Sequence, residues 1–169
     1  TGKNGLRIYN EIKKEWIEKA DVVEFGSIAI RSAKMKDSEL TLNTDGSVSG
    51  VAYKRNKQNM ILWGITDDSY IFTSYMTGIP EKYYGDEFLV RTYAIDATGN
   101  VYYGEIVALS VFDIANAIDD GNSVNGTNPS PTDKSAFYSF VNANNFVNYA
   151  TWCKNNNKSV GVLFTEQYQ

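Results

Sequence analysis

Apolar and polar residues alternate along much of the chain before residue 110. Apolar side chains at every second position predict half-buried strands, because successive side chains of a strand point to opposite faces. The strand-forming runs are residues 6–12, 22–35, 60–65, 70–76, 87–95 and 101–108, of which 60–65 is nearly continuously apolar, and two shorter runs lie within residues 40–53. Turn-forming residues separate them, and Asp45-Gly46 is the strongest hairpin signal. Together they predict about seven short strands, which is typical of a β-sandwich.

The segment DEFLVRTYAIDATGNVYYGE, residues 86–105, has the pattern of a central hairpin of that sandwich. Its alternation predicts that Phe88, Val90, Thr92 and Ala94 share one face and that Leu89, Arg91, Tyr93 and Ile95 share the other. We expect Arg91 to have a structural role, either stacked on Tyr93 or Tyr103 or paired with Glu105 across the hairpin.

The pattern changes after residue 110, where Val111, Ile114, Ala115 and Ile118 recur at helical spacing and predict a short helix. A loop or linker rich in Gly, Asn, Ser and Pro follows.

Ser130, Pro131 and Asp133 then form the start signal of a second helix, which is predicted to run to about Cys153. The segment SVGVLF, residues 159–164, predicts a final strand. The expected organisation is a β-sandwich domain over residues 1–118, a linker or loop over 119–133, and a helix plus terminal strand over 134–169 that packs on the sandwich.

The composition of the 169 residues, with 43% hydrophobic and 21% charged, is that of a globular chain. The net charge of -4 argues against nucleic acid or an anionic membrane as the main partner, because both require a basic surface. One Cys and no His exclude an intrachain disulfide, a Ser-His-Asp or Cys-His catalytic site, and a zinc site built from His and Cys. No stretch approaches the length of a membrane-spanning apolar segment, so we expect no membrane insertion.

The stretch IPEKYYGDEFLVRTYAI resembles the penultimate strand of fibronectin type III and related immunoglobulin-like domains, with Phe88 at the usual Tyr position. Over roughly residues 5–118, the segments GLRIYNEI, VVEFGSIAI, YIFTSYMTGIP, FLVRTYAI, GNVYYGE and SVFDIA resemble a β-sandwich module of secreted and cell-surface proteins. These proteins come from anaerobic, often gut-dwelling, Gram-positive bacteria, in which the module lies beside dockerin or carbohydrate-active modules. The resemblance implies an immunoglobulin-like or fibronectin-like sandwich, an extracellular setting and no catalytic residue.

Aromatic residues make up 14% of the chain, and sugars bind proteins by stacking their C–H faces on such rings. The predicted ligand-binding residues, each placed where one face of its ring is expected to be exposed, are Trp16, Tyr83, Tyr93, Tyr102 and Trp152. Trp63 lies in a continuous apolar run and is predicted to be in the core. The alternative for any of these aromatics is that it covers the core beneath the late helix.

Three other groups of residues are candidates for hydrolysis, calcium binding or thiol chemistry. The carboxylate pairs Asp67-Asp68, Asp86-Glu87 and Asp119-Asp120 lie next to turn residues, where acidic side chains serve turns more often than hydrolysis. The segment DDGNSVNG, residues 119–126, offers oxygen ligands for a structural calcium ion, but it lacks the EF-hand pattern and a solvated linker is the favoured interpretation. Cys153 is predicted to be a buried, small apolar residue.

The sequence therefore predicts a non-catalytic extracellular module that binds carbohydrate or supports adhesion, as part of a surface or cellulosome-type protein. We expect a monomer whose partners are a polysaccharide or glycan and neighbouring modules of the same protein, with no cofactor. The alternative is a structural spacer or protein-interaction module without glycan binding. A hydrolase is the third choice, because no carboxylate pair stands out.

Overall fold

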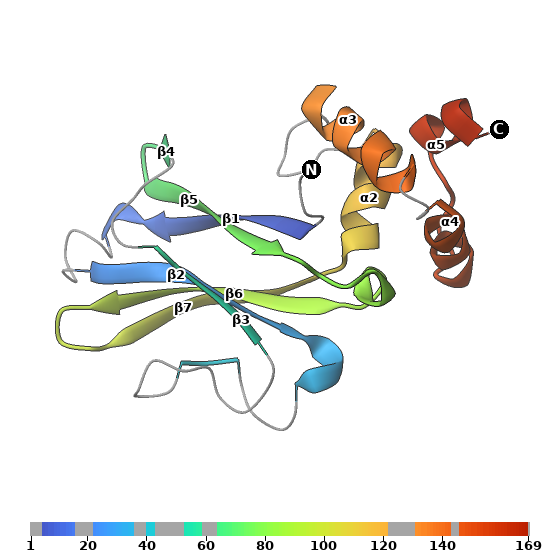
Figure 1. The fold of residues 1–169 in the computed structure, drawn as a ribbon. Coiled ribbons are helices and arrows are strands. Elements are labelled where there is room, and N and C mark those ends of the chain that lie inside the picture. The colour runs from blue at the N-terminus through green and yellow to red at the C-terminus, as the bar shows by residue number, and fades with distance from the viewer. Residues whose placement is uncertain are drawn as a thin grey trace. The chain divides into compact units, whose positions relative to one another are not determined.

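The computed structural model describes residues 5–15, 22–35, 40–42, 53–58, 64–121, 131–142 and 146–168 (Figure 1). The chain divides into two units. The β unit comprises residues 1–79 and 86–109, and the helical unit comprises residues 80–85 and 110–169.

Two antiparallel sheets make up the β unit. One sheet has the strand order β1-β5-β4 and the other has the order β3-β2-β6-β7 (Figure 1). The strands are β1 (Gly5–Lys13), β2 (Val22–Arg31), β3 (Tyr53–Gln58), β4 (Gly64–Ile65), β5 (Ser69–Thr77), β6 (Phe88–Asp96) and β7 (Val101–Leu109), and a 3-10 turn, η1 (Ser32–Lys34), follows β2.

The two sheets share a buried core. Ile12 of β1 and Phe72 of β5 pack with Phe25 of β2 and Ala94 of β6, and the Phe25 and Phe72 ring centroids are 4.7 Å apart. Apolar residues at alternate positions on both sheets therefore face each other, as a sandwich requires.

A second cluster covers the opposite face of β2 and β6. Ile28, Ile30 and Tyr93 from these strands pack with Leu40 from the segment after β2. The two central strands are thus buried on both faces, which explains why β2 is a nearly continuous apolar run with small residues between the large ones.

The prediction of a largely β fold with helices after residue 110 is confirmed, and the sheets are antiparallel. The alternation predicted for residues 88–95 is also confirmed, because Ala94 lies in the core between the sheets while Tyr93 lies in the second cluster. The Asp45-Gly46 turn and Trp63 lie outside the described residues.

Helices with an aromatic core make up the rest of the chain. Phe112 has ring contacts with Tyr84, Phe140, Tyr149 and Trp152, with centroids 5.6–6.1 Å apart. The elements are the 3-10 turn η2 (Glu81–Tyr83) and the helices α2 (Val111–Asp119), α3 (Pro131–Phe140), α4 (Phe146–Asn155) and α5 (Val162–Tyr168).

Helix α2 confirms the predicted short helix. Its N-terminus has a capping box that the sequence analysis did not identify: the Ser110 side chain accepts a hydrogen bond from the Asp113 amide, and the Asp113 carboxylate accepts one from the Ser110 amide.

Two predictions in this region are wrong. The single helix predicted up to Cys153 is instead two helices, Pro131–Phe140 and Phe146–Asn155. Residues 141–142 continue the first helix in a π conformation, and residues 143–145 lie outside the described residues. The strand predicted at residues 159–164 is instead the approach to α5 and its first turn. A residue distant in sequence stabilises this helical start. The Asp119 carboxylate accepts hydrogen bonds from the Gly161 and Phe164 amides.

Candidate functional site

The outward-facing side of the β1-β5-β4 sheet carries aromatic and charged side chains. The inward positions of β1 and β5 are buried, whereas most of the alternate positions are exposed or half-buried. We call the outward residues of these two strands the outer face: Arg7, Tyr9, Glu11 and Lys13 on β1, and Ile71, Thr73, Tyr75 and Thr77 on β5.

Register brings an arginine and two tyrosines together on this face. Arg7 is the direct cross-strand partner of Tyr75, and Tyr9 is the partner of Thr73. The guanidinium carbon of Arg7 lies 5.0 Å from the centroid of the Tyr9 ring. Tyr75 is 57% exposed, which makes it a large, accessible ring beside a fixed cation.

A ring beside a cation can bind a flat, hydroxylated ligand without covalent chemistry. The ring face stacks on the C–H groups of a sugar, while a neighbouring hydroxyl such as that of Thr73 is of the kind that hydrogen-bonds to sugar oxygens. Glu11 and Lys13 extend the polar part of the face along β1. The arrangement is therefore suited to recognition.

A buried polar network supports the strand that carries Arg7 and Tyr9. The Asn10 side-chain amide donates to the Ile8 carbonyl at 3.3 Å and to the Ser74 hydroxyl at 3.1 Å. The Thr92 hydroxyl of the facing sheet donates to the side-chain oxygen Oδ1 of Asn10 at 2.7 Å. Because Asn10 is 1% exposed, these bonds form in a medium of low dielectric constant, which strengthens them and holds the two sheets in one register.

Two of the predicted binding residues lie on β6 and β7. Tyr93 is 1% exposed and its hydroxyl donates to Glu24, so it belongs to the core. Tyr102 is half-buried and its hydroxyl donates to Asp96 at 2.9 Å. Tyr102 pairs with Ala94, whereas Tyr93 pairs with Tyr103, so the two predicted residues point to opposite faces and form no common surface.

The other predicted residues are in the helical unit or outside the described residues. Tyr83 of η2 and Trp152 of α4 are both half-buried, and each has a lysine amine over its ring: Lys82 at 4.9 Å and Lys158 at 5.2 Å. The Trp152 indole contacts the buried Phe112 ring, with centroids 5.6 Å apart, so it contributes to the core of the helical unit. Trp16 lies outside the described residues.

Two structural predictions are confirmed. The Arg91 guanidinium carbon lies 4.5 Å from the centroid of the Tyr103 ring, and its Nε donates to the Gly104 carbonyl at 2.7 Å. Cys153 is 1% exposed, and burial raises the pKa of its thiol.

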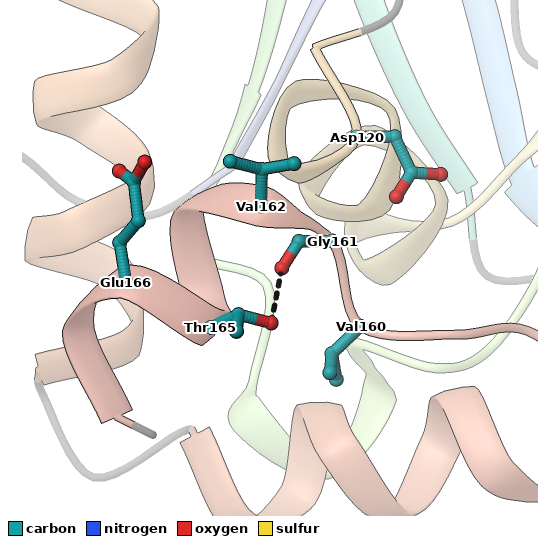
Figure 2. A pocket seen from close by; sticks show the side chains of 6 residues that line it. All are labelled: Asp120, Val160, Gly161, Val162, Thr165 and Glu166. Carbon is teal, nitrogen blue, oxygen red and sulfur yellow. Dashed lines mark hydrogen bonds between the residues drawn. The ribbon is translucent and has the colours of Figure 1, made fainter.

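An open hollow of about 490 Å³ lies in the helical unit, beside the start of α5. Figure 2 shows Asp120 and Glu166 at opposite ends of this hollow, so their carboxylates do not converge as glycoside hydrolysis requires. Burial, followed by the charge of Asp119, raises the pKa of Asp120. The remaining lining residues are Val160, Gly161, Val162 and Thr165, and the Thr165 hydroxyl is already bonded to the Gly161 carbonyl.

One other predicted carboxylate is engaged in an ion pair. Asp86 pairs with Arg31 at 3.3 Å. Asp119 is fully buried and bonded to the Tyr149 hydroxyl in addition to the two amides of α5. Its carboxylate is therefore already engaged in holding the helical unit together.

Within the described ranges, no group of three or more acidic, Cys or His side chains could hold a metal ion. Most of the segment considered for calcium, after Gly121, is outside those ranges. Among the helices that the structure describes, none has both the length and the apolar character that a membrane crossing needs.

The sequence analysis did not predict the outer face, because its candidates were tryptophans and adjacent tyrosines. The signal was present in the alternation itself, since LRIYNEI places Arg7, Tyr9 and Glu11 on one face and Leu6, Ile8 and Ile12 on the other. What the sequence does not contain is the pairing of β1 with β5, which brings Tyr75 beside Arg7.

The chain matches no protein-family model, no curated protein and no solved structure.

Proposed function

We propose that this chain is a non-catalytic module that binds carbohydrate through the outer face of the β1-β5-β4 sheet. The observation that carries the proposal is the 57% exposed ring of Tyr75, held directly across from Arg7, whose guanidinium stacks on Tyr9. An exposed aromatic ring on a polar sheet face is the kind of surface on which sugars stack.

The strand order supports an immunoglobulin-like assignment of the β unit. Immunoglobulin-like domains place strands B, E and D in one sheet and C, F and G in the other, with C′ beside C where it is present. The sheets β1-β5-β4 and β3-β2-β6-β7 follow that order, with the seven strands taken as B, C, C′, D, E, F and G along the chain. β6 then takes the place of strand F, the penultimate strand that residues 88–95 resemble.

The resemblance to bacterial surface modules extends the proposal to the setting of the protein. In that setting the chain is an adhesive or carbohydrate-binding part of a larger secreted or cell-surface protein. The buried network around Asn10 suits such a role, because a rigid sheet presents its ligand-binding side chains with little loss of entropy on binding.

Affinity electrophoresis through gels containing polysaccharides tests the proposal. The panel comprises neutral plant polymers, acidic plant polymers and host-type glycans. We expect at least one polymer to retard the folded chain, Tyr75→Ala to lose about tenfold or more in affinity, and Tyr75→Phe, which keeps the ring, to bind as the wild type does. Unretarded migration of the folded protein through every gel, or full binding by Tyr75→Ala, overturns the proposal.

An exposed part of β7 favours a second candidate, a protein-interaction module. Among the described strands β7 pairs only with β6, so one of its backbone edges is open within that set. Ile106 is 44% and Val107 is 55% exposed, and as consecutive residues they point to opposite faces. An apolar open edge is the kind of surface on which another chain adds a strand.

Co-purification with the neighbouring modules of the parent protein tests this second candidate. It predicts that wild type is retained and that Val107→Lys is not, whereas Tyr75→Ala is retained. Equal retention of wild type and Val107→Lys excludes the β7 edge as the contact.

A further inference from the structure

The larger sheet ends in a strand whose apolar side chains are exposed on both faces. Among the described strands, β7 pairs with β6 alone, so the backbone edge on its other side is open within that set. Residues 105–108 of β7 are exposed without interruption, and Glu105 is the only charged one. An apolar strand with an open edge is a template for another strand, and soluble chains usually protect such an edge with several charges or with Pro.

Val107 lies on the face of this sheet that points toward the β1-β5-β4 sheet, and yet it is uncovered. It is the direct partner of Val90 on β6, which is the partner of Ala29 on β2, so the three side chains form one row on one face. Ala94, four residues along β6 from Val90, lies in the core between the sheets and identifies that face. The exposed fraction along the row is 2% at Ala29, 3% at Val90 and 55% at Val107. The covering of the core therefore ends at β6, and an apolar residue of β7 lies beyond it.

We infer that the β7 edge pairs with β7 of a second copy of this chain, in an antiparallel arrangement with Val107 at the two-fold axis. The inference goes beyond carbohydrate binding, replaces the monomer expected from the sequence, and names the partner of the edge that the second candidate function uses. A two-fold axis makes such a contact self-complementary, since the same strand lies on both sides of it. β7 pairs regularly with β6 from Ile106 to Leu109, so this stretch has the strand geometry that pairing requires.

The charge and length of the strand select this register. With Val107 on the axis, Ile106 lies opposite Ala108 of the second copy and Glu105 lies opposite Leu109 of the second copy, so no like charges meet. Centring the pair on Glu105 would place two carboxylates side by side, and centring it on Ile106 would place each carboxylate against Val107. A centre nearer to Leu109 shortens the paired stretch, because β7 ends there. The register on Val107 therefore joins apolar side chains on both faces of the extended sheet.

The dimer presents two carbohydrate-binding faces to one side. A two-fold axis that relates neighbouring antiparallel strands is perpendicular to their sheet, so the β1-β5-β4 sheets of both copies lie on the same side of the joined sheet. The two outer faces then point in the same direction, and one polysaccharide can engage both, which raises the apparent affinity. This consequence rests on the proposed function, whereas the dimer itself does not.

Sedimentation of the full chain at protein concentrations from about 5 to about 500 µM tests the dimer. Because the paired stretch is short, we expect reversible association, with the average mass rising toward that of two chains as the concentration increases. Val107→Lys brings two ammonium groups together at the axis and should sediment as a monomer throughout. Val147→Lys makes the same substitution at a valine of α4 that is 57% exposed, and it should associate as the wild type does. Ile106→Lys is a second variant if circular dichroism shows Val107→Lys to be poorly folded.

A cysteine at the axis tests the register. Direct cross-strand partners have Cα atoms about 4.5–5.5 Å apart, within the range that a disulfide bridges, so Val107→Cys should form a covalent dimer under mild oxidation. In Ala108→Cys the two thiols are offset along the strands by two residues, about 7 Å, in addition to the spacing between the strands. This variant should cross-link about tenfold more slowly or less. The native thiol of Cys153 is buried and gives little background.

The outcomes separate this inference from the proposed function. A wild type that is monomeric at every concentration, or a dimer that persists in Val107→Lys, overturns the dimer. Cross-linking of Val107→Cys no faster than that of Ala108→Cys overturns it as well, because the contact is then not centred on Val107. None of these results bears on carbohydrate binding, which is measured by retardation in gels with Tyr75→Ala as its variant.

A dimeric chain that no polysaccharide retards overturns the proposed function and leaves the dimer in place. If the chain both binds a polymer and dimerises, Val107→Lys should lose about tenfold or more of the apparent affinity in the gel, whereas Val147→Lys should lose none.

Discussion

Arg7 and Tyr75 are direct partners across the antiparallel β1–β5 pair, and both side chains point away from the core. Sixty-seven residues of chain between them give no sign of this proximity in the sequence. The pair exists because the inward residues of both strands, such as Ile8 and Met76, fix the register by their burial. A one-residue slip would bury Arg7 and Tyr75 and expose the core, so the binding face and the fold depend on the same register.

The Asp96 carboxylate, in the turn between β6 and β7, should make the protein less stable in acid. The Asp96 carboxylate accepts hydrogen bonds from the side chains of Thr98, Asn100 and Tyr102, and from the amides of Thr98 and Asn100. These bonds, that of the Thr98 hydroxyl foremost, hold the pKa of Asp96 well below its usual value.

Near pH 4 the unfolded chain therefore binds more protons at Asp96 than the folded chain does. Its contribution to stability is complete above about pH 4 and is lost as the pH falls towards the folded pKa. Urea midpoints should fall between pH 5 and pH 2, and Asp96→Asn should weaken that dependence. An unchanged pH profile in Asp96→Asn would contradict this role.

Asp119 predicts a large effect of a small substitution in the helical unit. Its oxygens accept hydrogen bonds from the Gly161 and Phe164 amides at 2.6 and 2.7 Å and from the Tyr149 hydroxyl at 2.8 Å. In Asp119→Asn one oxygen becomes an N–H donor that faces another donor, and an unsatisfied buried group costs about 1–3 kcal/mol. We expect the free energy of unfolding to fall by about 2 kcal/mol or more, measured with urea by circular dichroism. Glu166→Gln, at an exposed position of the same unit, is the control and should change it by less than about 0.5 kcal/mol.

Two serines in the core between the sheets predict opposite effects of the same substitution. The Ser27 hydroxyl is buried and has no hydrogen-bond partner among the described residues, whereas the Ser74 hydroxyl accepts a bond from the Asn10 amide. Ser27→Ala removes an unsatisfied group and should stabilise the protein by up to about 1 kcal/mol, while Ser74→Ala should destabilise it by about 1–2 kcal/mol. Thermal and urea unfolding of both variants measure this, and a Ser27→Ala variant less stable than wild type would show that its hydroxyl is satisfied.

Cys153 should not react with thiol reagents in the folded protein. The side chain is 1% exposed, and burial raises the pKa of its thiol, so little reactive thiolate is present at neutral pH. Ellman's reagent should modify less than one thiol per chain over an hour in buffer and a full equivalent in 6–8 M urea. Rapid modification in buffer would show that the helical unit opens frequently.

The strands were predictable because successive side chains of a strand point to opposite faces, which gives the sequence a period of two. Residues 88–95 are the clearest example, since Ala94 and Tyr93 lie on the two opposite faces that the alternation predicts. The helix Val111–Asp119 was predictable for the corresponding reason at helical spacing.

The errors arise where distant residues decide local structure. Residues 162–164 are apolar and β-prone, but the buried carboxylate of Asp119 binds the amides there and favours a helical turn over a strand. Tyr93 was predicted to have an exposed ring, but Leu40, from a segment distant in sequence, packs on that face of β6 and buries it. Arg7 and Tyr75 became a candidate site only through the register of β1 on β5.

The most direct test of the central claim is an NMR titration of the isotope-labelled chain with an oligosaccharide of the polymer that retards it most strongly. Binding at the outer face predicts amide chemical-shift changes concentrated in residues 5–13 and 69–77, with their loss in Tyr75→Ala. Shift changes confined to the helical unit or to β7, with the amides of β1 and β5 unmoved, would contradict the account.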